Sequence, residues 1–115
     1  MNMMNIKFLI AVTLLCLGIS VAAAGEIVSL AYEVPLSEFR APATTNGGAS
    51  FRECSECERH LVRVTAATHY VINGKSMQLQ AFKEALLHAN DRDEKTLTVL
   101  HHLESDTIQS ISVSL

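Results

Sequence analysis

Apolar residues alternate with polar ones over several short segments of this chain, and one segment alone has clear helical spacing. In residues 26–34, EIVSLAYEV, every second side chain is apolar, so an extended strand would carry all of them on one face. These apolar residues are Val28, Leu30, Tyr32 and Val34. Pro35 lacks a backbone N–H and helps to end the strand. The alternation therefore predicts a half-buried strand in a β-rich protein.

Three further segments also have the composition of strands. Residues 60–72 are rich in β-branched side chains and predict one long bent strand, or two short strands that break near Ala66. Asn73 and Gly74 follow, a pair that supplies the positive φ angles of a tight turn. The last two strand segments are expected to pair as a hairpin, 95–103 and 107–115.

The helical segment is expected from about Met77 to Ala89. Leu79, Phe82 and Leu86 recur there at i, i+3 and i+7, and Ser76 is placed to cap the first turn. We therefore expect an α+β, β-rich fold of about five strands, with one helix between the third and fourth. An OB-like small barrel and an open antiparallel sheet both fit this order.

The first 24 residues have the layout of a secretory signal peptide. Lys7 precedes an apolar run over residues 8–21, and three alanines at 22–24 supply an A-x-A cleavage site. We predict that residues 1–24 are removed and that residues 25–115 form a single small domain in the periplasm or outside the cell. Retention of the segment as a membrane anchor is the alternative.

The charge of the chain bears on its partners. Twelve acidic residues outnumber nine basic ones, and no basic run is present. Nucleic acids and anionic membranes attract clusters of lysine and arginine, so neither is an expected ligand. A protein or a small ligand is the expected partner, without stable membrane insertion once the signal peptide is cleaved.

Residues 35–50 are expected to form a long loop or linker. The segment contains both prolines of the chain and the pair Gly47 and Gly48. Loops of this length are uncommon inside compact domains. We therefore predict that it is mobile or that a partner binds there.

A C-x-x-C motif, Cys54-Ser55-Glu56-Cys57, is the main chemical feature of the sequence. Loss of Cys16 with the signal peptide would leave these two cysteines, and an even number in an exported domain points to a disulfide. A ring this small contributes roughly 2 kcal/mol by the chain-entropy estimate. The disulfide would restrict the conformation of the loop, but the stability of the fold would not depend on it.

Two alternatives assign chemistry to the same cysteines. Cys54, Cys57 and His60 form C-x2-C-x2-H, which suits zinc or copper if the fold supplies a fourth ligand. The candidate fourth ligands are His69, His88, His101 and His102, with His101 included in the metal site that we consider.

The second alternative is a thiol-disulfide oxidoreductase, with Cys54 as nucleophile and Cys57 as resolving thiol. The acidic neighbours of these cysteines would raise a thiolate's pKa, which argues against it. Glu58 stands where c-type haem attachment requires histidine, so such a haem is excluded.

The pattern V-x-V-T-x-x-T-x-Y-x-x-N-G runs from residue 62 to residue 74. Its matching positions are Val62, Val64, Thr65, Thr68, Tyr70, Asn73 and Gly74. With the short helix that follows, it resembles small exported bacterial domains of unknown function that are described as OB-like. The resemblance covers about half of residues 25–115 and implies a fold without a catalytic set.

No other catalytic pattern is present in the sequence. The serines lack a nucleophile-elbow context, and no glycine-rich phosphate loop follows a strand. We therefore expect a non-enzymatic binding or interaction module that uses a sheet face or the 35–50 loop.

Overall fold

The computed structural model describes residues 28–115. They form a β-rich fold with one α-helix, as predicted, but the strands number eight and not about five. The elements are β1 (Ser29–Pro35), the 3-10 helix η1 (Leu36–Glu38), β2 (Phe39–Arg40), β3 (Gly48–Phe51), β4 (His60–Arg63), β5 (His69–Ile72), β6 (Lys75–Met77), α2 (Leu79–Leu87), β7 (Thr96–His102) and β8 (Thr107–Val113). The predicted signal peptide lies outside the described residues.

The eight strands belong to one mixed sheet that does not close into a barrel. Strands β1, β7 and β8 are successive antiparallel neighbours, and β2, β3 and β4 form a second antiparallel group. The two groups meet at β8, where Arg63 of β4 pairs in parallel with Thr107. Further along β8, from Ser110 to Val113, β5 pairs in parallel with the same edge of the strand. The sheet is therefore neither a closed OB-like barrel nor purely antiparallel.

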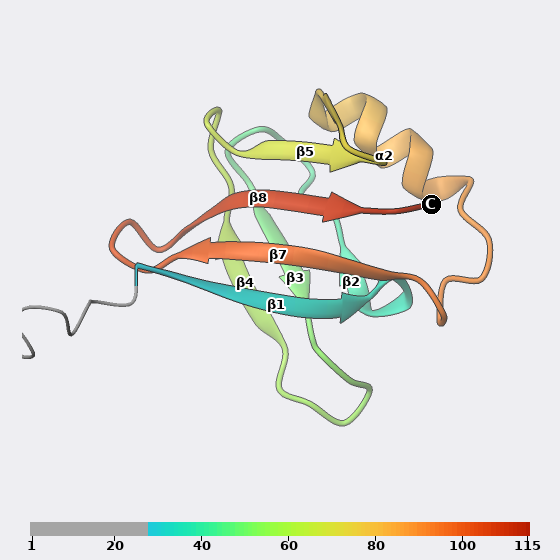
Figure 1. Ribbon diagram of the computed structural model, residues 1–115. Coiled ribbons are helices and arrows are strands. Elements are labelled where there is room, and N and C mark those ends of the chain that lie inside the picture. Colours follow the sequence, from blue (N-terminus) through green and yellow to red (C-terminus); the bar gives the residue numbers. More distant parts are fainter. Residues whose placement is uncertain (1–27) are drawn as a thin grey trace, which may run out of the picture.

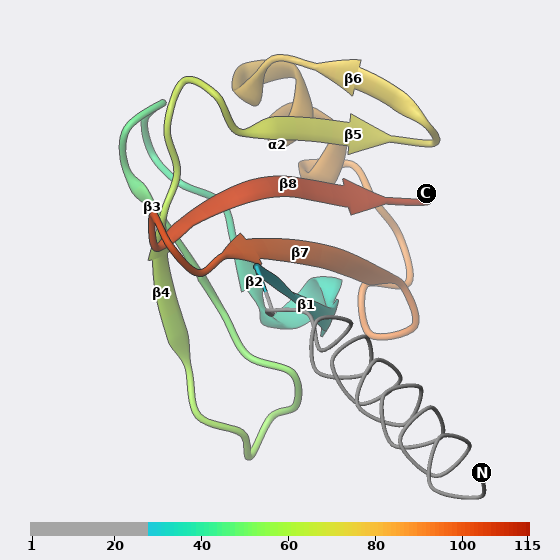
Figure 2. The ribbon, with the colours of Figure 1, turned by 60° about the vertical axis from the view of Figure 1, so that its left-hand side comes forward.

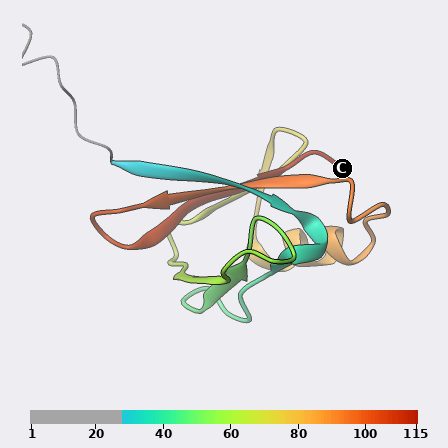
Figure 3. The same cartoon turned by 90° about the horizontal axis from the view of Figure 1, so that it is seen from below.

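This branching at β8 folds the sheet into two layers. Figure 1 shows β2, β3 and β4 crossing behind β1 and β7 at a steep angle. Seen from below, β1, β7 and β8 form one layer, while β3, β4 and α2 lie on the other side (Figure 3). Side chains from one face of β1, β7 and β8 are thereby enclosed.

The core lies between these layers, as the period-two pattern requires. Val34 of β1 pairs with Leu97 of β7, which in turn pairs with Val113 of β8, so the three side chains share one face. Phe82 and Leu86 of α2 cover the same core from the helix side. The buried apolar residues are Val34, Leu36, Phe39, Ala49, Phe51, Val62, Val64, Tyr70, Ile72, Phe82, Leu86, Leu97, Val99, Ile108, Ile111 and Val113.

The predicted break in residues 60–72 is confirmed, because β4 and β5 are separate short strands. Thr68 holds the bend between them: its Oγ1 donates to the carbonyl of Ile108 at 2.7 Å and accepts from the backbone N–H of Thr65 at 3.0 Å. The side chain is buried. A satisfied buried hydroxyl therefore fixes the point where the chain leaves one strand group for the other.

The turn and the helix also follow their local sequence. Asn73 and Gly74 both have positive φ, 52° and 80°, and join β5 to β6 in a tight hairpin. The helix α2 begins at Leu79, two residues later than predicted. Ser76 does not cap it, because that residue pairs with Val71 inside β6. Figure 2 shows the β5–β6 hairpin and α2 together at one end of the molecule.

The segment 35–50 is not the loop or linker that its prolines and glycines suggested. It contains η1, β2 and the start of β3, and Leu36 is fully buried. The backbone N–H of Leu36 donates to the carbonyl of Lys95 at 2.8 Å. Buried apolar side chains and this pairing tie the segment to the core, which leaves only residues 41–47 as a connecting turn.

Within residues 28–115, no helix is both long and apolar enough to cross a membrane.

Candidate binding pocket

The two cysteines of the C-x-x-C motif form a disulfide in the loop between β3 and β4. Their Cα atoms are 5.0 Å apart, and Cys54 is exposed. The predicted disulfide is therefore present. The loop offers no helix N-terminus, the feature that commonly lowers the pKa of a reactive thiol in oxidoreductases.

Two arginines hold the base of this loop to η1. Arg52 donates through Nε to the Glu38 carboxylate, and Arg59 contacts the same carboxylate through Nη2 at 3.5 Å. Arg59 also donates through Nη1 to Ser50 Oγ at 3.0 Å. The hydrogen bond from Arg52 is the main cause that lowers the pKa of Glu38 below its ordinary value of 4.5. Glu38 therefore joins the disulfide loop to the 35–50 segment.

The two histidines of the metal alternative lie beside Tyr32. Its ring centroid is 5.0 Å from that of His60 and 6.3 Å from that of His101. His101 is also tied by Nε2 to Asp106 Oδ1 at 2.7 Å. Among the described residues, no group of three or more His, Cys, Asp or Glu side chains is arranged to hold a metal ion. The cysteine sulfurs are bonded to each other, so neither is a thiolate ligand in this form.

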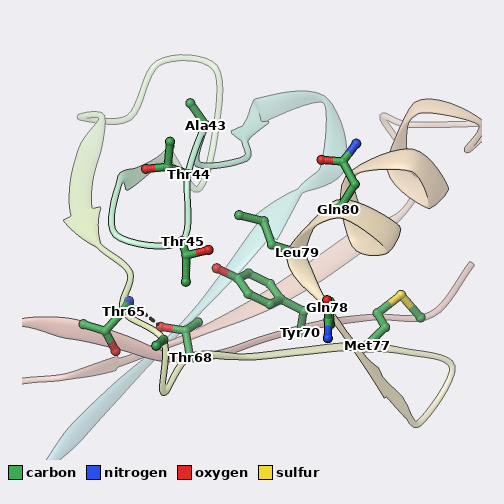
Figure 4. A pocket seen from close by; sticks show the side chains of 11 residues that line it. Ala43, Thr44, Thr45, Thr65, Thr68, Tyr70, Met77, Gln78, Leu79 and Gln80 are labelled. Atoms are coloured by element: carbon green, nitrogen blue, oxygen red, sulfur yellow. Dashed lines mark hydrogen bonds between the residues drawn. The ribbon is translucent and has the colours of Figure 1, made fainter.

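A candidate binding pocket lies elsewhere in residues 28–115, at the end occupied by α2. It has a volume of about 540 Å³ and is formed by the 41–47 turn, the bend between β4 and β5, and the segment where β6 leads into α2. Figure 4 shows these three walls facing one another. The lining residues are Ala43, Thr44, Thr45, Thr65, Ala66, Thr68, Tyr70, Met77, Gln78, Leu79 and Gln80.

Among the residues that line this pocket, Tyr70 has a buried hydroxyl that makes no hydrogen bond. Its side chain is only 5% exposed, and Oη has no hydrogen-bond partner. Burial raises the pKa of this phenol above its ordinary value of 10.0, so the hydroxyl stays protonated and available as a donor at neutral pH. Figure 4 shows it pointing away from β5, toward the side of the pocket formed by Thr45 and Leu79.

The position of Tyr70 follows from its strand. Register on β5 places it opposite Met77 of β6 and Ile111 of β8, and its ring packs against Phe82 with centroids 5.2 Å apart. Packing against Phe82 and burial of the side chain fix the position of the ring. The hydroxyl is therefore held in place and has little freedom to turn toward another partner.

The sequence indicated parts of this pocket without locating it. It predicted that the 35–50 segment is either mobile or a place where a partner binds, and Ala43, Thr44 and Thr45 of that segment line the pocket. It assigned Tyr70 only to a structural pattern. Alternation along β5 predicts that Tyr70 faces inward, but it does not predict that a turn 25 residues earlier leaves space above its hydroxyl.

Comparison with known proteins adds no relative: no protein-family model, no curated protein and no solved structure matches this chain. Its function therefore has to be inferred from its own residues.

Proposed function

We propose that this chain is an exported, non-enzymatic binding module that holds a small ligand in the pocket above Tyr70. One observation carries the proposal: a buried hydroxyl without a partner faces a pocket that three separate elements build. Leaving such a group unpaired costs about 1–3 kcal/mol, and a ligand oxygen that accepts a hydrogen bond from it removes that cost. A pocket of about 540 Å³ falls in the range of small-molecule sites, about 300–1,000 Å³.

Two further features support the proposal. The disulfide suits an oxidising compartment, in agreement with the signal-peptide pattern of residues 1–24. The walls are also anchored, since Thr68 donates to Ile108 and the 41–47 turn is held by backbone hydrogen bonds from Gly47 to Thr44 and from Val64 to Gly47. A site with fixed walls loses less entropy when it orders a ligand.

The test is chemical-shift mapping on the purified protein with four probe classes: neutral disaccharides, blocked dipeptides, free amino acids and nucleosides. We expect at least one probe to cause saturable shifts at the backbone amides of Thr45, Tyr70 and Leu79. Ala66→Trp introduces a large side chain from an exposed position at the rim and should suppress those shifts. Ala31→Trp, on an exposed position of β1 outside the pocket, should leave them unchanged.

Two results would overturn the proposal. One is the absence of saturable shifts at these amides for every probe up to millimolar concentration. The other is binding that both tryptophan variants retain in full.

A further inference from the structure

We infer that the pocket binds an uncharged saccharide, one oxygen of which accepts a hydrogen bond from the hydroxyl of Tyr70; this inference rests on the proposed binding function. The geometry that carries it is the buried hydroxyl set among threonine and glutamine side chains.

The pocket offers nothing to balance a charged ligand. Among its lining residues, Tyr70 is the only one whose side chain ionises, and burial keeps it neutral. A carboxylate or an ammonium group would meet no opposite charge there to offset the hydration that it gives up on contact with Tyr70. The ligand is therefore uncharged.

The lining favours a ligand with many hydroxyl groups. Threonine hydroxyls and glutamine amides each donate and accept hydrogen bonds, and they come from opposite walls: Thr44 and Thr45 from the turn, Gln78 and Gln80 from the start of α2. A sugar ring likewise carries donors and acceptors around its whole edge. Met77 and Leu79 provide the apolar surface on which the C–H groups of such a ring can rest.

The pocket is less suited to flat aromatic ligands such as nucleosides. The only aromatic ring in the lining is that of Tyr70, and it is buried against Phe82. The ring is buried and its hydroxyl end points toward Thr45 and Leu79 (Figure 4), so a base would find no exposed ring to stack on. Binding through hydrogen bonds without stacking also predicts modest affinity.

The test measures the affinity of the purified protein for four probes by calorimetry and chemical shifts. Cellobiose and N,N′-diacetylchitobiose are neutral disaccharides, the glucosamine dimer is a cationic disaccharide, and blocked dialanine is a neutral peptide. We expect saturable binding of at least one neutral disaccharide at the amides of Thr45, Tyr70 and Leu79. The cationic dimer and the peptide should bind more weakly.

Matched tyrosine variants test the role of the hydroxyl. Tyr70→Phe keeps the ring and should weaken binding of the neutral disaccharide by about two- to tenfold, the value of one hydrogen bond. Tyr32→Phe removes the chain's other phenolic hydroxyl, which lies outside the pocket, and should leave the affinity unchanged.

The outcomes separate this inference from the proposed function. If blocked dialanine, or the cationic dimer, binds at these amides and neither neutral disaccharide does, the saccharide inference fails while the binding function stands. If no probe of any class shifts these amides, both fail. Equal affinity of Tyr70→Phe and the unaltered protein for the disaccharide would remove the hydroxyl from the inference and overturn it.

Discussion

Tyr70 and Glu38 are the two side chains whose ionisation the fold changes most clearly among residues 28–115. The two pKa values shift in opposite directions, for different reasons. Burial without a partner raises the pKa of Tyr70, whereas charged hydrogen bonding lowers that of Glu38. The first marks a group that is available to a ligand, and the second marks a group that holds the structure together.

Replacing Tyr70 separates stability from binding. Tyr70→Phe retains the ring contact with Phe82 and removes a buried hydroxyl that has no partner. We expect the free energy of unfolding to stay level or to rise by up to about 1 kcal/mol. Urea denaturation measures it, with Tyr70→Leu as a control that loses the ring contact and should be destabilised. A loss above about 1 kcal/mol in Tyr70→Phe would indicate that the hydroxyl is paired.

Glu38 makes stability dependent on pH. A carboxyl with a lowered pKa in the folded state stabilises the protein above its unfolded pKa and loses this contribution as pH falls through the folded value. Glu38→Gln should therefore be less stable than the unaltered protein at pH 7. The difference should shrink below pH 4.5 and vanish once Glu38 is protonated. Thermal denaturation at a series of pH values tests this, and a difference that persists at low pH would contradict it.

At the level of elements, turns and register decide where the pocket walls stand. The tight β5–β6 turn brings Met77 opposite Tyr70, and α2 starts two residues later. The wall where β6 leads into α2 is therefore set by local signals, the Asn73-Gly74 turn and the helical spacing. The distance between the walls is set by how these elements pack.

The turn can be tested at Gly74, whose φ is +80°. An added Cβ meets nothing within 4 Å, so the cost of Gly74→Ala is conformational alone. We expect a loss of about 1 kcal/mol in the free energy of unfolding, measured by urea denaturation. Gly74→Asn should lose less, because asparagine tolerates this backbone region better. Equal losses in both variants would point to a side-chain cause.

The disulfide loop can be tested by removing both sulfurs. Cys54→Ser combined with Cys57→Ser should keep the fold, because β3 and β4 remain paired and both arginines still reach Glu38. The expected loss is roughly 2 kcal/mol or less for a ring of this size. Circular dichroism and urea denaturation measure both properties. A chain that no longer folds would show that the disulfide is essential to the whole structure.

At the level of the whole molecule, the sheet branches at β8 and encloses one core between two layers. The same branching brings residues 41–47 over β5 and α2, so the pocket exists only in the assembled molecule. Neither strand group alone contains all of its walls.

Export and the state of the cysteines are tested together by the intact mass of protein purified from the periplasm. We expect a chain that starts at Gly25, is two hydrogens lighter than the reduced form and resists alkylation after denaturation, because the sulfurs are bonded. Thiols that alkylate only after denaturation, in a native species heavier by one zinc or copper ion, would favour the metal alternative. A chain that retains residues 1–24 would contradict cleavage.

Much of the secondary structure could be predicted because its signals are local. Alternation around Tyr32 and Val34, the Asn73-Gly74 turn and the spacing of Phe82 and Leu86 all act within a few residues. The number of strands was underestimated because some strands are short: β2 and β6 have two and three residues, too few to show a period. The prediction that residues 35–50 form a long loop was wrong because the burial of Leu36 depends on strands that are distant in the sequence.

The sequence by itself determined the β-rich class and the helix of residues 28–115 and pointed to the Cys54–Cys57 disulfide, because each depends on neighbours along the chain. Only the tertiary structure decided that Glu38 pairs with two arginines, that the sheet stays open, and that Tyr70 faces a pocket without a partner. These features depend on groups far apart in sequence. Their energies arise from charge pairing, burial and packing between groups that meet only once the layers have assembled.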